Sequence, residues 1–174
     1  MNRVLPFLPL LALIVVVAIG GFLLTRRAQP EHFTAGMIGQ AAPSYTLPRL
    51  GGGEAVTSEA THGRAHLVNL FASWCTPCRA EHGALMALQA GGVEIVGVAY
   101  KDEAEDTARY IAELGDPYSA IGMDRDGQLG LQFGATGAPE TYVIGADGMV
   151  KAVYRGPLTR EVIDRTIMPA LHGR

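Results

Sequence analysis

The chain has 174 residues, a formal net charge of -3 and two cysteines. This length suits one ordinary domain with a hydrophobic core plus an additional segment. The weakly acidic charge balance excludes nucleic acid as a partner, because it offers no basic surface to a phosphate backbone. Two cysteines are too few for the multi-bridge framework of a small secreted domain, so the pair needs a local explanation.

Residues 4–24 form an uncharged apolar run of the length that a helix needs to cross a bilayer. A cleaved signal peptide is the competing interpretation. Its apolar region covers only about 7 to 15 residues and ends in a small-residue site, whereas this run is longer and is followed by Arg26 and Arg27. We therefore expect a retained membrane anchor. The flanking charges do not set its orientation, because Arg3 and the terminal amine balance the two arginines.

The stretch after this run is polar, contains glycine and proline, and is interpreted as a linker. The expected organisation is an anchor over residues 1–27, a linker over residues 28–37 and a folded domain over residues 38–174. Residues 47–63 are rich in turn residues and predict a short hairpin or loop at the entry to the domain.

A regular alternation of strands and helices follows. Residues 66–73 and 93–100 are short apolar runs that suit strands buried on both faces. Between them, residues 77–90 predict a helix, which Gly91 and Gly92 end.

The second half of the domain continues this pattern. A helix is expected over residues 103–114, with Asp102 as its cap. Residues 140–156 hold two β-rich runs joined through Asp147-Gly148, a strong hairpin signal. A last helix is expected from residue 159 to about residue 168. The predicted fold is an α/β domain with a mixed central sheet flanked by helices.

Both cysteines stand in the stretch Trp74-Cys75-Thr76-Pro77-Cys78, between the first predicted strand and the first predicted helix. Unpaired N–H groups and the positive end of the helix dipole lower the pKa of Cys75 and favour its thiolate. A thiolate attacks a disulfide, and the second thiol then resolves the mixed disulfide by closing the ring. Pro77 is tolerated in the first turn, where its missing N–H has no partner to lose.

Three other interpretations of the cysteine pair are weaker. A buried structural pair fits poorly with such a sequence at a strand-to-helix turn. Structural zinc needs about four ligands, and nearby His66 and His82 do not resemble a ligand set, so we expect no metal and place both histidines on the surface. A static disulfide staple would constrain the unfolded chain little across so short a loop.

Residues 68–78, VNLFASWCTPC, resemble the active-site strand and turn of the thioredoxin superfamily, and residues 137–144, GAPETYVI, resemble its cis-proline loop. With GVAYKD at residues 97–102 and ELGDPY at residues 113–118, the resemblance narrows to the membrane-anchored thiol:disulfide interchange proteins of cytochrome c maturation, the CcmG/DsbE type. It runs from about Ile38 to the C-terminus and includes the anchor.

The resemblance implies a role for each residue around the pair. Cys75 would be the exposed nucleophile and Cys78 the buried resolving thiol, and this redox-active disulfide would need no further cofactor. Pro139 would be cis and would present the backbone of Ala138 to an extended substrate peptide. Trp74 would cover one side of the site, unless it is a core aromatic instead.

This chain departs from the family pattern in how it would handle the proton of the second cysteine. Many thioredoxins carry a buried aspartate where this chain has Asn69, which accepts no proton. Candidate replacements are Glu140 and Glu81, and Glu140 is preferred because Glu81, one turn after Cys78, also fits a solvated helix face. Asp102, at the same edge of the sheet, is either a further site residue or only a helix cap. The intervening dipeptide is Thr-Pro where the family often has Pro-Thr, which leaves the reduction potential open.

The resemblance also implies a place and partners. The anchor would sit in the bacterial inner membrane as a single pass, with the N-terminus in the cytoplasm and the domain in the periplasm. The domain would reduce an oxidised CxxCH haem-binding site in apocytochrome c, or a partner thiol protein, and a membrane electron donor of the DsbD or CcdA kind would reduce it in turn.

Other activities remain as alternatives to this one. The main alternative is a general periplasmic disulfide reductase of broader range. A thiol peroxidase is disfavoured because the sequence around Cys75 lacks the setting of a peroxide-reacting cysteine. A copper-delivery protein is disfavoured because only two residues separate the cysteines.

Overall fold

The computed structural model describes residues 15–20, 22 and 36–173. The chain divides into two units, Met1–Glu31 and His32–Arg174. In the first unit, residues 15–20 are helical and most of their side chains are exposed. No helix within the described ranges is long and apolar enough to cross a membrane. The anchor expected over residues 4–24 lies mostly outside those ranges and stays a prediction, as does the linker over residues 28–37.

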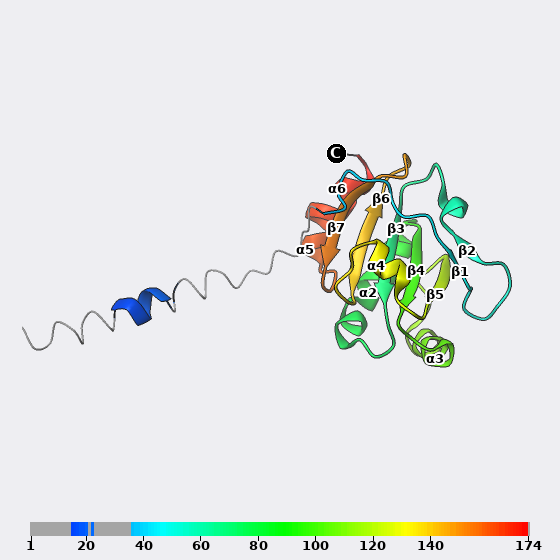
Figure 1. Cartoon of the computed structure of the whole chain (residues 1–174), viewed down its shortest axis with the longest axis horizontal. Coiled ribbons are helices and arrows are strands. Elements are labelled where there is room, and N and C mark those ends of the chain that lie inside the picture. The colour runs from blue at the N-terminus through cyan, green and yellow to red at the C-terminus, as the bar shows by residue number, and fades with distance from the viewer. Residues whose placement is uncertain (1–14, 21, 23–35, 174) are drawn as a thin grey trace, which may run out of the picture. The chain divides into compact units, whose positions relative to one another are not determined.

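The second unit is built on a five-stranded mixed sheet with the order β5-β4-β3-β6-β7 (Figure 1). The central strand β3 pairs parallel with β4 and antiparallel with β6. Strand β5 extends the parallel half, and β7 extends the antiparallel half. The strands are β3 His66–Phe71, β4 Ile95–Tyr100, β5 Ala120–Asp124, β6 Glu140–Ile144 and β7 Val150–Arg155. The α/β fold with a mixed central sheet is confirmed.

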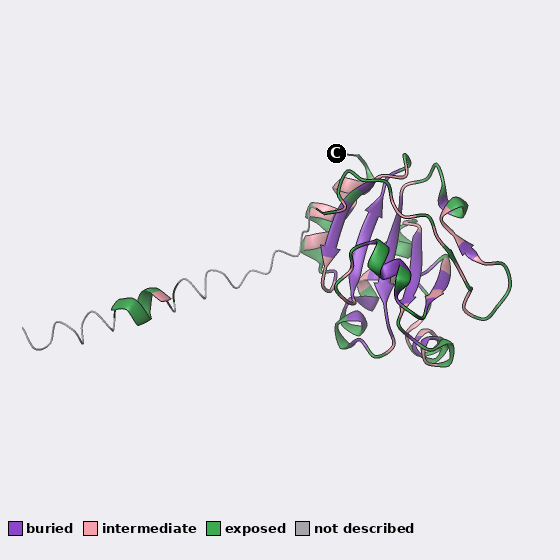
Figure 2. Cartoon of the chain, viewed as in Figure 1, coloured by how far each residue is buried: buried purple, intermediate pink, exposed green. Residues whose placement is uncertain are grey.

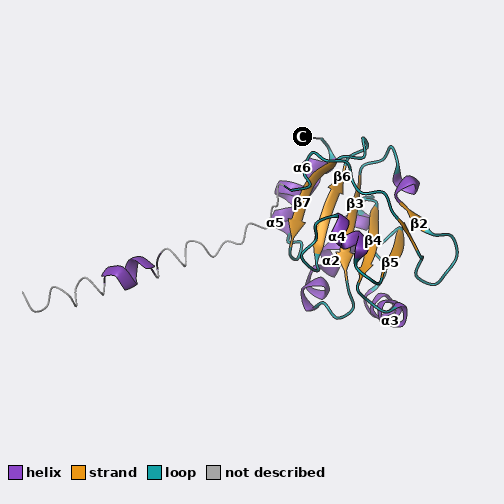
Figure 3. Cartoon of the chain, viewed as in Figure 1, coloured by secondary structure: helices purple, strands orange, loops and turns teal. Residues whose placement is uncertain are grey.

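Helices cover both faces of this sheet (Figure 3). The helices α2 (Thr76–Ala90) and α3 (Ala104–Leu114) pack on one face together with the C-terminal segment. The short helix α4 (Gln128–Gln132) packs on the other face, in front of the sheet in Figure 1. The C-terminal segment runs through α5 Arg160–Val162, the π-helical turn η3 Ile163–Ile167 and α6 Met168–Leu171.

A short antiparallel hairpin precedes the main sheet, where turn residues had indicated a hairpin or loop. It consists of β1 (Thr46–Leu47) and β2 (Val56–Thr57), and the 3-10 turn η2 (Ser58–Thr61) follows it. This hairpin leads directly into the start of β3.

Alternate residues of β3 serve the two layers of the core. Leu67 and Phe71 join the cluster that includes residues of α2 and α3, whereas Val68 and Leu70 join the cluster that includes α4. Figure 2 shows that the strands of the sheet are buried along most of their length. By the same alternation, Asn69 points to the layer that holds α2.

The strand boundaries differ slightly from those expected from sequence. Strand β3 ends at Phe71 rather than Ser73, and β4 begins at Ile95 rather than Val93. Pairing between the two strands stops at these residues, so the flanking apolar residues lie outside the strands. The final helical segment also extends further than expected, to Leu171.

Two elements, β5 and α4, were not expected from sequence. Strand β5 contains Gly122, which interrupts the apolar pattern of a short segment. This glycine lies directly under Leu47, because a Cβ atom added there would come within 2.8 Å of the leucine side chain. The contact between β1 and β5 therefore leaves room only for glycine here, although a strand usually has a larger residue at such a position.

Candidate active site

Strand β3 leads to the cysteine pair at the carboxyl edge of the parallel strands. Cys75 is the N-cap residue of α2, Cys78 lies in the first turn, and the two form a disulfide. The backbone N–H of Cys78 donates to Cys75 Sγ at 3.1 Å, so the helix start offers this sulfur a donor. Pro77 stands in the first turn, as expected. Cys75 is only 3% exposed, against 1% for Cys78, so the nucleophile is far less exposed than the resemblance implied.

Trp74 lies at the surface beside the pair and is not a core aromatic. Its side chain is 58% exposed, and its Nε1 donates to the backbone carbonyl of Lys101 at 3.1 Å. Lys101 follows β4 and has a φ of 49°, in the left-handed region that residues other than glycine seldom adopt. The turn after β4 therefore meets the cysteine segment at the same edge of the sheet.

Asp102 binds this turn to the segment before the cysteines. Its carboxylate accepts from the N–H and the hydroxyl of Ser73 at 2.7 and 2.8 Å, and from the hydroxyl of Thr107 at 2.8 Å. It also accepts from the N–H of Glu103, and Glu103 is the N-cap residue of α3. Asp102 was expected to be the cap, but it lies one residue before the N-cap of α3, and its bonds to Ser73 place it at the edge of the site.

The expected cis-proline loop faces the cysteine segment across a groove. The peptide bond between Ala138 and Pro139 is cis. A groove of about 250 Å³ is lined by Pro77 on one side and by Ala138, Pro139 and Gly156 on the other. An extended peptide in this groove would run beside the backbone of Ala138 and close to the disulfide.

Glu140 is buried on the face of the sheet that carries α4. It pairs in register with Leu70, whose side chain belongs to the core on that face. Five donor groups surround its carboxylate: the N–H and hydroxyl of Thr136, the N–H of Gly137, the hydroxyl of Tyr142 and the guanidinium of Arg155. Two of these donor residues belong to the loop before Pro139, so the carboxylate holds that loop in place.

Glu81 lies on the opposite face, on α2, one turn after Cys78. It has no exposed surface, so it is not a solvated face residue. Its Oε1 accepts from Asn69 Nδ2 at 3.0 Å and its Oε2 from the N–H of Leu158 at 2.8 Å. Burial raises the pKa of Glu81 to about 7, although the two hydrogen bonds act to lower it.

The two candidate proton acceptors lie on opposite faces of the sheet. Glu81 shares a helix and a face of the sheet with Cys78, and burial raises its pKa to about 7. Glu140 lies on the other face, where five donor groups surround its carboxylate. Of the two candidate carboxyl groups, only Glu81 therefore lies on the face of the sheet that holds Cys78.

The two histidines expected on the surface are buried, with 6% of His66 and 4% of His82 exposed. Burial lowers the pKa of both rings. His82 Nε2 lies 3.1 Å from the carbonyl of Gly115, and its Nδ1 lies 3.2 Å from the hydroxyl of Tyr110. The expectation failed because each ring has hydrogen-bond partners that the fold brings in from a separate segment or turn.

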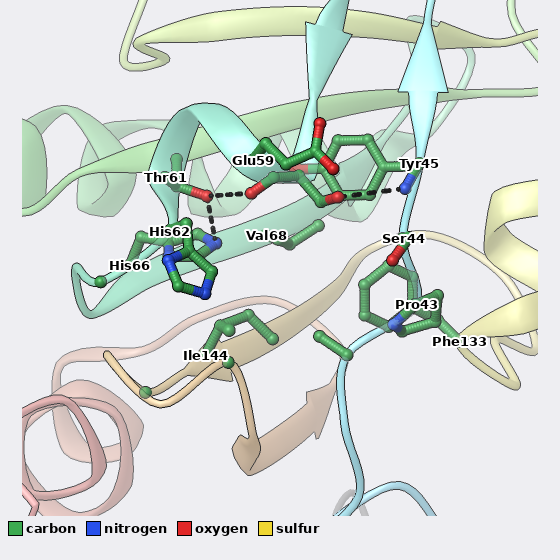
Figure 4. Close-up of a pocket in the computed structure, with 15 residues that line it drawn as sticks. Pro43, Ser44, Tyr45, Glu59, Thr61, His62, His66, Val68, Phe133 and Ile144 are labelled. Carbon is green, nitrogen blue, oxygen red and sulfur yellow. Dashed lines mark hydrogen bonds between the residues drawn. The ribbon is translucent and has the colours of Figure 1, made fainter.

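His66 lines a separate cavity of about 190 Å³ at the amino end of β3 (Figure 4). Its Nε2 lies 3.1 Å from the hydroxyl of Thr61. At about 3.3 Å per residue, the length of β3 places this cavity roughly 16 Å or more from the cysteine pair. Within the part of the chain that the structure describes, no group of three or more His, Cys, Asp and Glu residues could hold a metal ion.

Comparisons with known proteins agree with this site. The Redoxin family model matches residues 37–168. The thiol:disulfide interchange protein HelX of Rhodobacter capsulatus is 38% identical over an alignment that covers 99% of this chain and 98% of that protein. The thiol:disulfide interchange protein DsbE of Escherichia coli is 34% identical and is aligned over 97% of this chain and 94% of its own.

A solved structure shows the same fold. The crystal structure of a thiol:disulfide interchange protein of the thioredoxin family from Chlorobium tepidum superposes with a TM-score of 0.65 and is 31% identical. The match covers 75% of this chain and 95% of that one. The chain therefore belongs to the Redoxin family and, within it, to the thiol:disulfide interchange proteins, so it is a thiol:disulfide oxidoreductase with Cys75 and Cys78 as its redox pair.

Proposed function

We propose that this chain is a periplasmic reductant in cytochrome c biogenesis. Its substrate would be the disulfide of a CxxCH haem-binding site in apocytochrome c, or of a partner thiol protein that handles that site. The observation that carries the proposal is the buried Glu81 carboxyl one turn after Cys78. It provides a base near neutral pH for the proton that the dithiol must lose when it reduces a substrate.

The first step is attack by the Cys75 thiolate on a substrate disulfide. A bond forms between Cys75 Sγ and one substrate sulfur, the substrate S–S bond breaks, and the other substrate sulfur leaves as a thiolate. The N–H of Cys78, donating to Cys75 Sγ, favours the thiolate before the attack. Because Cys75 is so little exposed, the substrate has to approach along the groove between Pro77 and Pro139.

The second step resolves the mixed disulfide. Cys78 loses its proton to the Glu81 carboxylate, and its thiolate attacks Cys75 Sγ. The Cys75–Cys78 bond forms, the bond between Cys75 Sγ and the attached substrate sulfur breaks, and that sulfur leaves as a thiolate. The substrate gains two electrons and the chain loses two, which yields the disulfide state that the structure holds.

The proposal includes a place in the cell and a source of electrons. Residues 4–24 would anchor the chain in the bacterial inner membrane, with the domain in the periplasm. A membrane electron donor of the DsbD or CcdA kind would return two electrons to the Cys75–Cys78 disulfide after each turnover. The relatives that align over nearly the whole chain are named thiol:disulfide interchange proteins. These names support the exchange of a disulfide and specify no substrate.

The direction of the reaction is tested by the reduction potential of the full chain, equilibrated with glutathione or dithiothreitol buffers. A value near about -270 mV, or somewhat above it, supports a reductant. A value near about -120 mV would mark an oxidant and overturn the proposal.

The substrate is tested with an oxidised CxxCH peptide and a matched peptide in which the histidine is replaced by alanine. We expect Cys75→Ser to abolish reduction and Cys78→Ser to accumulate a mixed disulfide with the peptide, visible by mass spectrometry. Normal turnover by Cys78→Ser would refute the assigned roles. Equal rates on the two peptides and on unrelated disulfides would favour the broader reductase.

A further inference from the structure

A chain of hydrogen bonds leads through the interior of the domain to the Glu81 carboxyl. The Tyr118 hydroxyl donates to Asn69 Oδ1 at 2.9 Å, and Asn69 Nδ2 donates to Glu81 Oε1 at 3.0 Å. Asn69 Nδ2 also donates to the Thr141 hydroxyl oxygen at 3.0 Å. Asn69, Glu81 and Thr141 have no exposed surface, and Tyr118 is also buried. These polar groups therefore depend on one another for their hydrogen bonds.

The orientation of the Asn69 amide decides which form of Glu81 it favours. With its NH₂ group next to Glu81 Oε1, the amide stabilises the negative carboxylate. With its carbonyl oxygen there, it would accept a hydrogen bond from the protonated acid and favour that form. Because the Tyr118 hydroxyl donates to the Asn69 carbonyl oxygen, it supports the orientation that presents the NH₂ group to Glu81.

These hydrogen bonds oppose the effect of burial on Glu81. Burial raises the pKa of this carboxyl to about 7, and the donors on Leu158 and Asn69 keep it from rising further. Three tyrosines also face Glu81 from other elements: Tyr110 of α3, Tyr118 ahead of β5 and Tyr154 of β7. Their own pKa values are raised, so they are uncharged near neutral pH.

We propose that Tyr118 and Asn69 are positioning residues for the resolving step at Cys78, because they hold Glu81 in the ionised form that accepts the thiol proton. The inference rests on the proton-accepting role proposed for Glu81. Tyr118 also stacks on Phe71, with 4.6 Å between ring centroids, so a substitution there affects packing as well. The pH profile of the resolving step separates the two roles.

The test uses the reduced full chain and the aromatic disulfide DTNB in excess. The Cys75 thiolate cleaves DTNB and releases one thionitrobenzoate, and Cys78 then attacks Cys75 Sγ and releases the second. The second phase is first order in the mixed disulfide, so its rate constant reports resolution alone. It is measured by stopped-flow absorbance between about pH 5 and about pH 9.

In Tyr118→Phe we expect the midpoint of this pH profile to move upward. The second phase should be about twofold to fourfold slower near pH 6 and should match the wild type near pH 9. The reason is that Asn69, no longer polarised by the Tyr118 hydroxyl, becomes a weaker donor to the Glu81 carboxylate. Asn69→Ala removes the donor itself, and its expected loss near pH 6 is about tenfold. If Asn69→Ala does not fold, Tyr118→Phe carries the test.

Tyr110→Phe is the matched control. Tyr110 also packs on Phe71 and also has a buried hydroxyl, but that hydroxyl pairs with His82 rather than with Asn69. We expect no shift of the midpoint in this variant. A Tyr118→Phe profile that is lowered by one factor at every pH, or shifted no more than the control, would overturn the proposal.

Titration of the Glu81 carboxyl in the oxidised full chain, followed by NMR of the isotope-labelled group, tells two failures apart. If Glu81→Gln resolves at the wild-type rate, the role of Glu81 is wrong and the proposal falls with it. If Glu81→Gln is slow but the carboxyl titrates at the same pH in wild type and Tyr118→Phe, only the positioning role is wrong. A higher titration midpoint in Tyr118→Phe, together with slow resolution by Glu81→Gln, supports the proposal.

Discussion

Replacing Glu81 by glutamine should change how the stability of the domain depends on pH. The carboxyl is fully buried, and burial raises its pKa from 4.5 to about 7. Between these values the folded chain keeps a proton that the unfolded chain has released. The free energy of unfolding therefore falls as the pH rises through this window, and the contribution is complete below about pH 4.5 and lost above about pH 7.

The size of this fall follows from the two pKa values. The difference between 4.5 and about 7 corresponds to about 3 kcal/mol of unfolding free energy. His66 and His82 act in the opposite direction, because burial lowers their pKa values and their contribution grows as the pH rises. The quantity to compare is therefore the wild-type curve minus the Glu81→Gln curve, in which the histidines cancel.

The assay is urea unfolding of the oxidised full chain at a series of pH values from about 4 to about 8. The unfolding free energy of Glu81→Gln should be lower than that of the wild type at every pH, because its amide has one oxygen and cannot accept from both Leu158 and Asn69. This constant offset is not the test. Glu161→Gln, at an exposed position of α5, is the control and should run parallel to the wild type. Parallel curves for wild type and Glu81→Gln would refute the raised pKa and the argument built on it.

Three further substitutions test the site edge and the core. Glu140→Gln should lower the free energy of unfolding in urea by about 1.5 to 3 kcal/mol, because this carboxylate holds the loop before Pro139. The pH midpoint of the resolving step should not change, and a shifted midpoint would indicate that Glu140 accepts the proton. Asp102→Ala removes both hydrogen bonds to Ser73, so it should lower the free energy of unfolding by about 2 kcal/mol and slow the first DTNB phase. Unchanged kinetics would show that Asp102 serves only the start of α3. Gly97→Ala places a Cβ 2.8 Å from the Tyr118 ring and should cost about 1 to 3 kcal/mol by thermal unfolding; wild-type stability would contradict this packing.

The sequence was sufficient for those parts of the fold that depend on local pattern. Short apolar runs and the Gly-Gly stop located β3, β4 and α2, and the Asp147-Gly148 turn located the hairpin of β6 and β7. Strand β5 was not predicted, because its Gly122 weakens the strand pattern. That glycine is required by the close contact with Leu47 of β1, which is distant in sequence. The boundary residues and β5 depend on contacts between distant segments, which local pattern does not record.

The two candidate acidic residues also differ in what local sequence reveals about them. Glu140 follows Pro139 in sequence, and this adjacency made it the preferred proton acceptor. Strand alternation turns its side chain to the face opposite α2, which adjacency alone does not reveal. Glu81 gains its properties from Leu158, 77 positions further along the chain, and from Asn69 on β3. No short motif contains these partners together.

The placement of Trp74 gives the protein an optical reporter of its own reaction. It is the single tryptophan of the chain and the immediate neighbour of Cys75, and its indole is exposed while its Nε1 is held by the Lys101 carbonyl. All intrinsic tryptophan emission therefore originates next to the reacting sulfur. Formation of the mixed disulfide, its resolution and the arrival of a partner protein should each change that emission, so unlabelled protein can be followed through a whole catalytic cycle.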